Sequence, residues 1–118
     1  MYNPITKLRD YLRYCEAVKK ADEAHAKNGD RYYVVPSNNK DGKILLLVMD
    51  RKNFRRLKFK GYINKDAKIR DLINESFYFT PYTNGDGYLD AEGRKLKLKL
   101  YYSYCKAMRN IKHGKKKV

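Results

Sequence analysis

Six of the ten residues from position 51 to position 60 are lysine or arginine, and they are the side chains whose type and spacing best fit a chemical role. Long cationic side chains on a fixed scaffold neutralise phosphates and bond to their oxygens without reading a base sequence. Asp50 can cap a helix that begins at Arg51, and Gly61 can end it. The first turn of such a helix would also present free backbone N–H groups to an anion. The segment therefore predicts a basic helix that contacts a nucleic-acid backbone.

A second concentration of positive charge lies near the end of the chain. Residues 91–118 carry ten Lys or Arg against one Asp or Glu, whereas residues 61–90 carry three against five. Such uneven charge, with a formal net of +15, is typical of a protein that binds a polyanion. The phosphate contacts predicted from the two segments are Arg51, Lys52, Arg55, Arg56, Lys58, Lys97, Lys99, Arg109 and Lys112.

The chain also contains twelve tyrosines, many for 118 residues. Aromatic rings beside cations can stack on unpaired bases. A tyrosine equally well fills the edge of a core while its hydroxyl reaches water, so the residue type alone does not decide between the two roles. The candidates for stacking are Tyr32, Tyr33, Tyr62, Tyr78, Tyr82, Tyr88 and Tyr102.

No pattern of an enzyme or of a metal site stands out. The sequence has no nucleophile elbow, no phosphate-binding glycine loop and no CxxC or histidine cluster, so we expect no catalysis, cofactor or metal. Residues 84–90 resemble positions three to nine of an EF-hand loop. However, Tyr82 and Gly93 occupy the two positions that normally supply carboxylates, and we interpret the segment as a turn.

Length and hydropathy predict one small domain away from membranes. The longest apolar run has six residues, Ile44 to Met49, far short of the ~20 of a membrane span. The first residues lack the features of a signal peptide, so we expect a cytoplasmic protein with no membrane contact. Cys15 and Cys105 are then interpreted as small core residues. The predicted domain covers residues 1–112, followed by a basic tail over 113–118.

Caps and periodicity predict the elements that position these side chains. A helix over 4–28 opens at Asn3 and ends at Gly29, strands over 31–36 and 43–49 form a hairpin, and the basic helix follows. Asp66 can cap a short helix, and residues 77–82 are expected to be extended or irregular and to pack on the core. A last helix is predicted over 90–112. The stripes expected to face the core are Ile5, Leu8, Tyr11, Leu12, Cys15 and Val18 in the first helix, and Leu96, Leu100, Tyr104, Met108 and Ile111 in the last.

Residues 11–19 are echoed by residues 101–109, with identical Tyr, Tyr, Cys and Ala at matching places. The echo favours similar helices at both ends, packed near each other. The predicted fold class is α+β: a small single domain in which long N- and C-terminal helices flank an antiparallel β-hairpin, with short helices between.

The predicted function is non-catalytic binding of nucleic acid, DNA or RNA, through the basic helices. Two alternatives use the same basic surfaces. The first is a protein-interaction module or inhibitor that docks on an acidic partner. The second is a structural component of a ribonucleoprotein or a virus particle.

Overall fold

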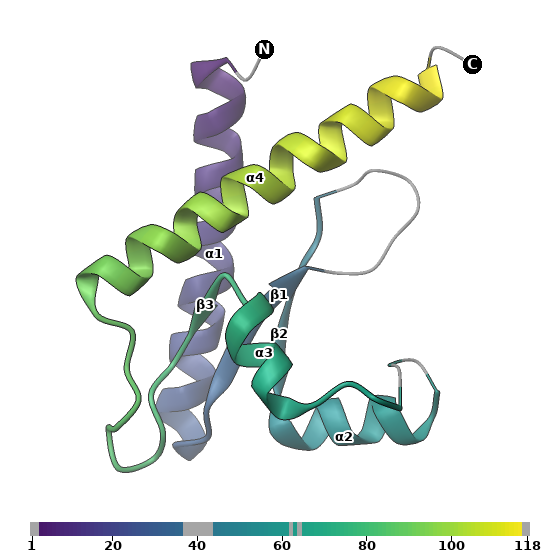
Figure 1. Cartoon of the computed structure of the whole chain (residues 1–118). Helices are drawn as coiled ribbons and strands as arrows, with labels where there is room; N and C mark the ends of the chain where they lie inside the picture. Colours follow the sequence, from purple (N-terminus) through teal and green to yellow (C-terminus); the bar gives the residue numbers. More distant parts are fainter. Residues whose placement is uncertain (1–2, 37–43, 62, 64, 117–118) are drawn as a thin grey trace.

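The computed structural model describes residues 3–36, 44–61, 63 and 65–116, the last six of them through their backbone only. It confirms an α+β domain in which two long terminal helices flank a hairpin (Figure 1). In chain order, the elements are α1 (Pro4–Asn28), β1 (Tyr32–Pro36), β2 (Leu46–Asp50), α2 (Arg51–Phe59), α3 (Ile69–Glu75), β3 (Tyr78–Phe79) and α4 (Ala91–Lys116). No helix within these residues is long and apolar enough to cross a membrane.

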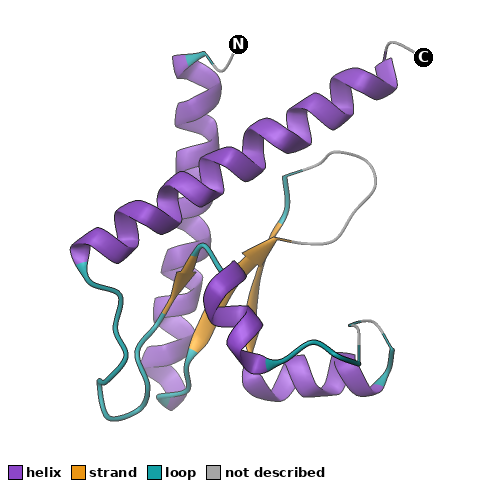
Figure 2. Ribbon diagram, viewed as in Figure 1, coloured by secondary structure: helices purple, strands orange, loops and turns teal. Residues whose placement is uncertain are grey.

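The three strands form one antiparallel sheet in the order β2-β1-β3 (Figure 2). Val34 of β1 lies opposite Val48 on one side and Tyr78 on the other. Because successive strand residues point to opposite faces, Tyr33 and Phe79 lie on the other face. Within the segment predicted as extended or irregular, Tyr78 and Phe79 form a short third strand beside the predicted hairpin.

Each face of the sheet carries its own hydrophobic cluster. On one face, Val34 and Tyr78 pack with residues of α1 and α4, including Ala21 and Tyr101. On the other face, Tyr33, Met49 and Phe79 pack with Phe54 of α2 and Leu72 of α3. The two long helices thus pack on one face of the sheet and the two short ones on the other, and Phe54 joins α2 to the second cluster.

Side-chain caps explain where the first two helices begin. The Asn3 carboxamide accepts a hydrogen bond from the Thr6 N–H at 2.8 Å, and Asp50 accepts one from the Asn53 N–H at 2.8 Å. Gly29 ends α1 with a φ of 76°, a left-handed conformation that glycine adopts without steric cost. The predicted ranges of both helices are confirmed to within one residue.

Three predicted boundaries need correction. The second strand spans Leu46–Asp50 rather than 43–49, and residues 37–43 lie outside the described part of the chain. The third helix is capped at Lys68, whose N–H donates to the Asp71 carboxylate at 2.8 Å, and not at Asp66. The last helix continues to Lys116, so most of the expected basic tail is helical.

The buried faces of both long helices differ in part from the predicted ones: Met108 of the predicted α4 stripe is buried, and Val18 and Tyr104 pack against the core. In α1 the buried side chains are Asp10, Tyr14, Ala17 and Ala21. In α4, Tyr101, Cys105 and Met108 are buried. The large apolar residues that defined the predicted stripes are exposed: Ile5 71%, Leu8 57%, Leu12 57%, Leu96 63% and Leu100 48%.

Contacts between α1 and α4 centre on Asp10, which is fully buried. Its carboxylate accepts a hydrogen bond from Arg109 Nη2 at 2.6 Å, and its backbone carbonyl accepts one from the Tyr101 hydroxyl at 2.5 Å. The Tyr101 ring lies 5.2 Å from that of Tyr14. The terminal helices therefore pack together as predicted, but the echoed residues are not equivalent, since Tyr101 is buried and its counterpart Tyr11 is exposed.

Candidate nucleic-acid interface

The basic helix α2 is fixed to the body of the protein by its apolar side. Phe54 is buried against the second cluster, and Leu57 packs beside it. At helical spacing, this anchoring directs Lys52, Arg55 and Arg56 away from the core. Figure 1 shows α2 at the end of the molecule far from the C-terminal half of α4, so the two predicted basic helices do not form one continuous surface.

Four predicted site residues come together on α2, which is the geometric core of the candidate site. Arg51, Lys52, Arg55 and Arg56 are all exposed. Within the described part of the chain, none of the four takes part in an ion pair. Within these described residues, their positive charge is thus not paired with a carboxylate and is available to an anionic ligand.

The N-terminus of α2 is less open than we expected. The Asp50 side chain accepts the hydrogen bond from the Asn53 N–H, and it places a carboxylate at the end where a phosphate would bind. An anion at this end would meet a like charge and one fewer free donor. On α2, the side chains are therefore more open to an anion than the first-turn N–H groups are.

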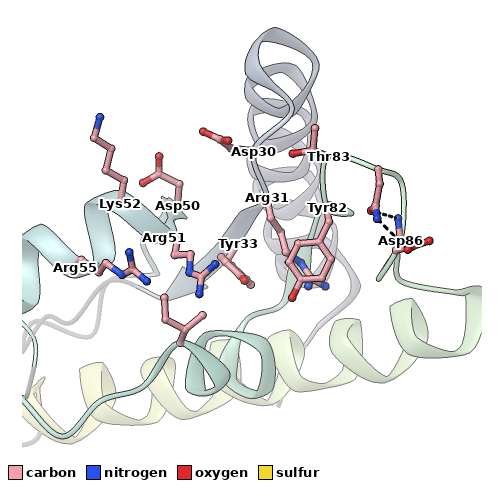
Figure 3. A pocket seen from close by; sticks show the side chains of 12 residues that line it. Asp30, Arg31, Tyr33, Asp50, Arg51, Lys52, Arg55, Tyr82, Thr83 and Asp86 are labelled. Carbon is pink, nitrogen blue, oxygen red and sulfur yellow. Dashed lines mark hydrogen bonds between the residues drawn. The ribbon is translucent and has the colours of Figure 1, made fainter.

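A cleft of about 910 Å³ lies beside α2 (Figure 3). The α2 side carries its cap Asp50 and the cations Arg51, Lys52 and Arg55, and the opposite side carries further polar and acidic groups. Figure 3 shows Asp30 and Thr83 across the cleft from α2. The full lining is Asp30, Arg31, Tyr33, Asp50, Arg51, Lys52, Arg55, Ile69, Tyr82, Thr83, Asn84 and Asp86. The cleft is therefore of mixed charge, because Asp30, Asp50 and Asp86 line it together with three of the four α2 cations.

Arg31 in this cleft is held by the protein itself. Its guanidinium lies 4.2 Å from the centroid of the Phe79 ring and 4.1 Å from that of Tyr82. Its Nε donates to the Thr80 carbonyl at 3.0 Å, and Nη2 donates to the Gly87 carbonyl at 2.7 Å. A Cβ at Gly87 would lie 3.0 Å from the Tyr82 ring. Arg31 and Gly87 therefore contact the Tyr82 ring, which is still 45% exposed.

Most of the other tyrosines proposed for stacking are engaged as well. Tyr33 and Tyr78 are buried, and burial raises the pKa of both hydroxyls. The half-buried Tyr32 accepts a hydrogen bond from Asn28, and Lys7 lies over the ring of Tyr102. Tyr62 lies outside the described residues, and Tyr88 is 70% exposed.

An aromatic residue that we did not predict lies among the cations. Phe59 of α2 is 94% exposed and lines a shallow hollow with Arg55, Lys58 and Lys65. Helical spacing in the sequence could have placed Phe59 beside the cations. Phe59 follows the inward-facing Phe54 by five residues, about 140° around a helix, and it follows Arg55 and Arg56 by four and three.

Three predicted site residues make internal contacts instead of facing solvent freely. The Lys97 ammonium donates to the carbonyls of Ile73 and Ser76 at the end of α3, and its burial lowers the pKa of the amine. Arg109 pairs with the buried Asp10. Lys58 donates to the Ala67 carbonyl at 2.6 Å. We leave these three out of the interface proposed below.

The remaining two predicted site residues belong to α4. Lys99 is exposed there, away from α2. The side chain of Lys112 lies outside the described residues. Among the predicted site residues whose side chains are described, the exposed cations that lie together are therefore those of α2.

The segment that resembles part of an EF-hand loop is a turn. The Asn84 carboxamide accepts from the Asp86 N–H at 3.0 Å and donates to the Asp86 carboxylate at 3.0 Å. Gly85 and Gly87 both have positive φ. In the part of the chain that the structure describes, no group of His, Cys, Asp and Glu is arranged to hold a metal ion, and both cysteines are free.

Comparisons of the chain with protein-family models, curated proteins and solved structures found no match.

Proposed function

We propose that the protein binds nucleic acid without catalysis, through phosphate contacts made by the exposed face of α2. The observation that carries the proposal is the set of four exposed cations, Arg51, Lys52, Arg55 and Arg56, which lie on one helix and form no ion pair in the described part of the chain. Neutralising phosphates with such side chains releases condensed counterions, which is the main source of sequence-independent affinity.

The rigid mounting of α2 supports the same function. Phe54 and the Asp50 cap fix the helix before any ligand arrives, so the cations start from a defined scaffold and binding does not have to order the backbone. Arginine dominates the surface, and its planar guanidinium bonds to two phosphate oxygens at once. These contacts position a nucleic acid but do not read its bases.

The proposal is tested by measuring binding of nuclease-treated protein to single- and double-stranded DNA and RNA across a salt series. We expect affinity to fall steeply as salt rises. In the variant Arg55→Glu/Arg56→Glu, binding should weaken for all sequences. The slope of log affinity against log salt should become shallower by about two, one for each phosphate contact removed.

A matched control separates local contact from overall charge. Lys19→Glu/Lys20→Glu changes the net charge by the same amount at two exposed positions of α1. If α2 is the interface, this control binds much more tightly than Arg55→Glu/Arg56→Glu at equal salt. Equal losses in both variants would show attraction by net charge alone and would contradict an interface on α2.

One observation favours the alternative of a protein-interaction module. Ile5, Leu8 and Leu12 of α1 and Leu96 and Leu100 of α4 are exposed, although large apolar side chains gain from burial. A protein partner could cover them. Failure of every nucleic acid to bind near physiological salt would reject the leading proposal and make this alternative the better one.

A further inference from the structure

Phe59 is the side chain on α2 whose exposure has the least structural explanation. Phe54, on the same helix, is buried and anchors α2 to the sheet, whereas Phe59 is 94% exposed. A phenylalanine gains roughly 1.5–3 kcal/mol when it is buried, and Phe59 forgoes nearly all of it in the free protein. Its ring is therefore available to a ligand in a way that the buried and packed aromatic residues are not.

The surroundings of Phe59 define the chemistry of that ligand. Arg55, Lys58 and Lys65 line the hollow of about 490 Å³ in which the ring lies. Lys52, Arg55 and Arg56 precede Phe59 by seven, four and three residues, so the four side chains follow one face of α2. At 1.5 Å per residue, this stripe extends for about 10 Å, the length of about three stacked nucleotides. A ligand that fits it carries several negative charges and, at the Phe59 end, a flat apolar surface.

Unpaired nucleotides match that description better than the other polyanions do. A base in a duplex has both faces covered by its neighbours, whereas a base in a single strand offers a face to an aromatic ring. An anionic membrane also carries charge, but a helix that binds at a membrane surface needs a broad apolar face. The other apolar residues of α2, Phe54 and Leu57, pack into the core instead.

We infer that the ligand of this protein is single-stranded nucleic acid, with phosphates along Lys52, Arg55 and Arg56 and one unpaired base stacked on Phe59. This inference rests on the proposed function and narrows it to one class of nucleic acid. Stacking tolerates every base because every base has a flat face, so the preference is for strandedness and not for sequence.

A single-tryptophan variant gives a direct reading of the stacking. The chain has no tryptophan, so Phe59→Trp introduces a unique fluorophore that keeps an aromatic ring at the site. On saturation with a single-stranded oligonucleotide, we expect strong quenching of this fluorescence and protection from acrylamide. The control Leu96→Trp places the fluorophore at an exposed apolar position of α4, outside the stripe, and should show little change.

Affinity measurements separate this inference from the proposed function. Phe59→Ala should weaken binding to a single strand on the order of tenfold and leave duplex binding nearly unchanged, whereas Arg55→Glu/Arg56→Glu should weaken both. Persistent single-strand binding with no quenching in Phe59→Trp and no loss in Phe59→Ala would overturn the stacking and leave phosphate binding by α2 intact. Absence of binding to any nucleic acid, with quenching by anionic phospholipid vesicles, would overturn both.

Discussion

The Tyr14 side chain joins α1 to two other parts of the fold, the segment just before β3 and the helix α4. Its hydroxyl donates to the Phe77 carbonyl at 3.1 Å, and its ring lies 5.2 Å from that of Tyr101 in α4. Burial raises the pKa of this hydroxyl from 10.0 to about 12. The folded protein therefore binds the Tyr14 proton more tightly than the unfolded chain does, which makes its stability depend on pH.

The sign of this dependence follows from the protonation states. Below about pH 10, Tyr14 is protonated in both states and its contribution to stability is complete. Between about pH 10 and 12 the unfolded chain loses the proton while the folded protein keeps it, so the free energy of unfolding falls by about 1.4 kcal/mol per pH unit. Cys105, whose pKa burial raises from 9.0 to about 12, adds to the loss in the same direction.

We predict that Tyr14→Phe flattens this alkaline loss. The variant should lose about 1 kcal/mol at neutral pH, where the hydrogen bond to Phe77 is missing. Above about pH 10 its unfolding free energy should then fall less steeply with pH than that of the unchanged protein. Urea unfolding at a series of pH values measures both effects. The exposed Tyr88→Phe is the control, and a slope unchanged by Tyr14→Phe would contradict the burial of the hydroxyl.

Charged residues show which features of the site could be predicted from sequence. The run from Arg51 to Arg56 was recognisable because an Asp50 cap and helical spacing suffice to place it on one exposed helix. Lys97 and Arg109 could not be placed from sequence, because their partners are a carbonyl pair at the end of α3 and a buried carboxylate 99 positions away. The sequence states a residue's charge, whereas its partner depends on tertiary contacts.

For the helices and strands, the sequence was enough to predict that each element forms, but not which face of a helix is buried. Asn3, Asp50 and Gly29 mark helix ends by local hydrogen bonds or by a left-handed φ, and such signals depend on only a few neighbouring residues. The buried face of α1 was predicted from its largest apolar side chains. The structure instead turns Ala17 and Ala21 toward the sheet, because small side chains let the helix backbone lie close to the strands.

The two candidate faces of α1 can be compared by substitution. We predict that Leu8→Gln changes the free energy of unfolding by no more than about 0.5 kcal/mol, because Leu8 is exposed and both residues favour helix. Ala21→Leu should cost about 1–3 kcal/mol, because it forces three extra carbon atoms into a fully buried position. Urea unfolding of the two variants measures both changes in the free energy of unfolding. A larger cost for Leu8→Gln would mean that the large apolar stripe is the buried face.

Across the whole molecule, the net charge of +15 destabilises the folded state through repulsion between like charges. The same repulsion acts within α2. Arg51 and Arg55 are four residues apart, and Lys52 precedes Arg55 and Arg56 by three and four. Each like-charge pair at this spacing destabilises a helix by roughly 0.2–0.5 kcal/mol. A surface selected only for stability would have acids among these positions. The repulsion is relieved when phosphates bind, so the arrangement suits a ligand-binding surface.

This repulsion lets one variant separate loss of contact from loss of structure. We predict that Arg55→Glu/Arg56→Glu, which is expected to weaken nucleic-acid binding, makes the free protein more stable at low salt, because each repulsive pair that Arg55 and Arg56 form at this spacing becomes attractive. The gain should shrink as salt screens the exposed charges. Thermal unfolding of the variant and of the unchanged protein at low and high salt measures this gain in stability. A lower midpoint for the variant would instead show that Arg55 or Arg56 supports the fold. Weaker binding together with a higher midpoint would mean that the lost affinity came from the missing guanidinium groups themselves.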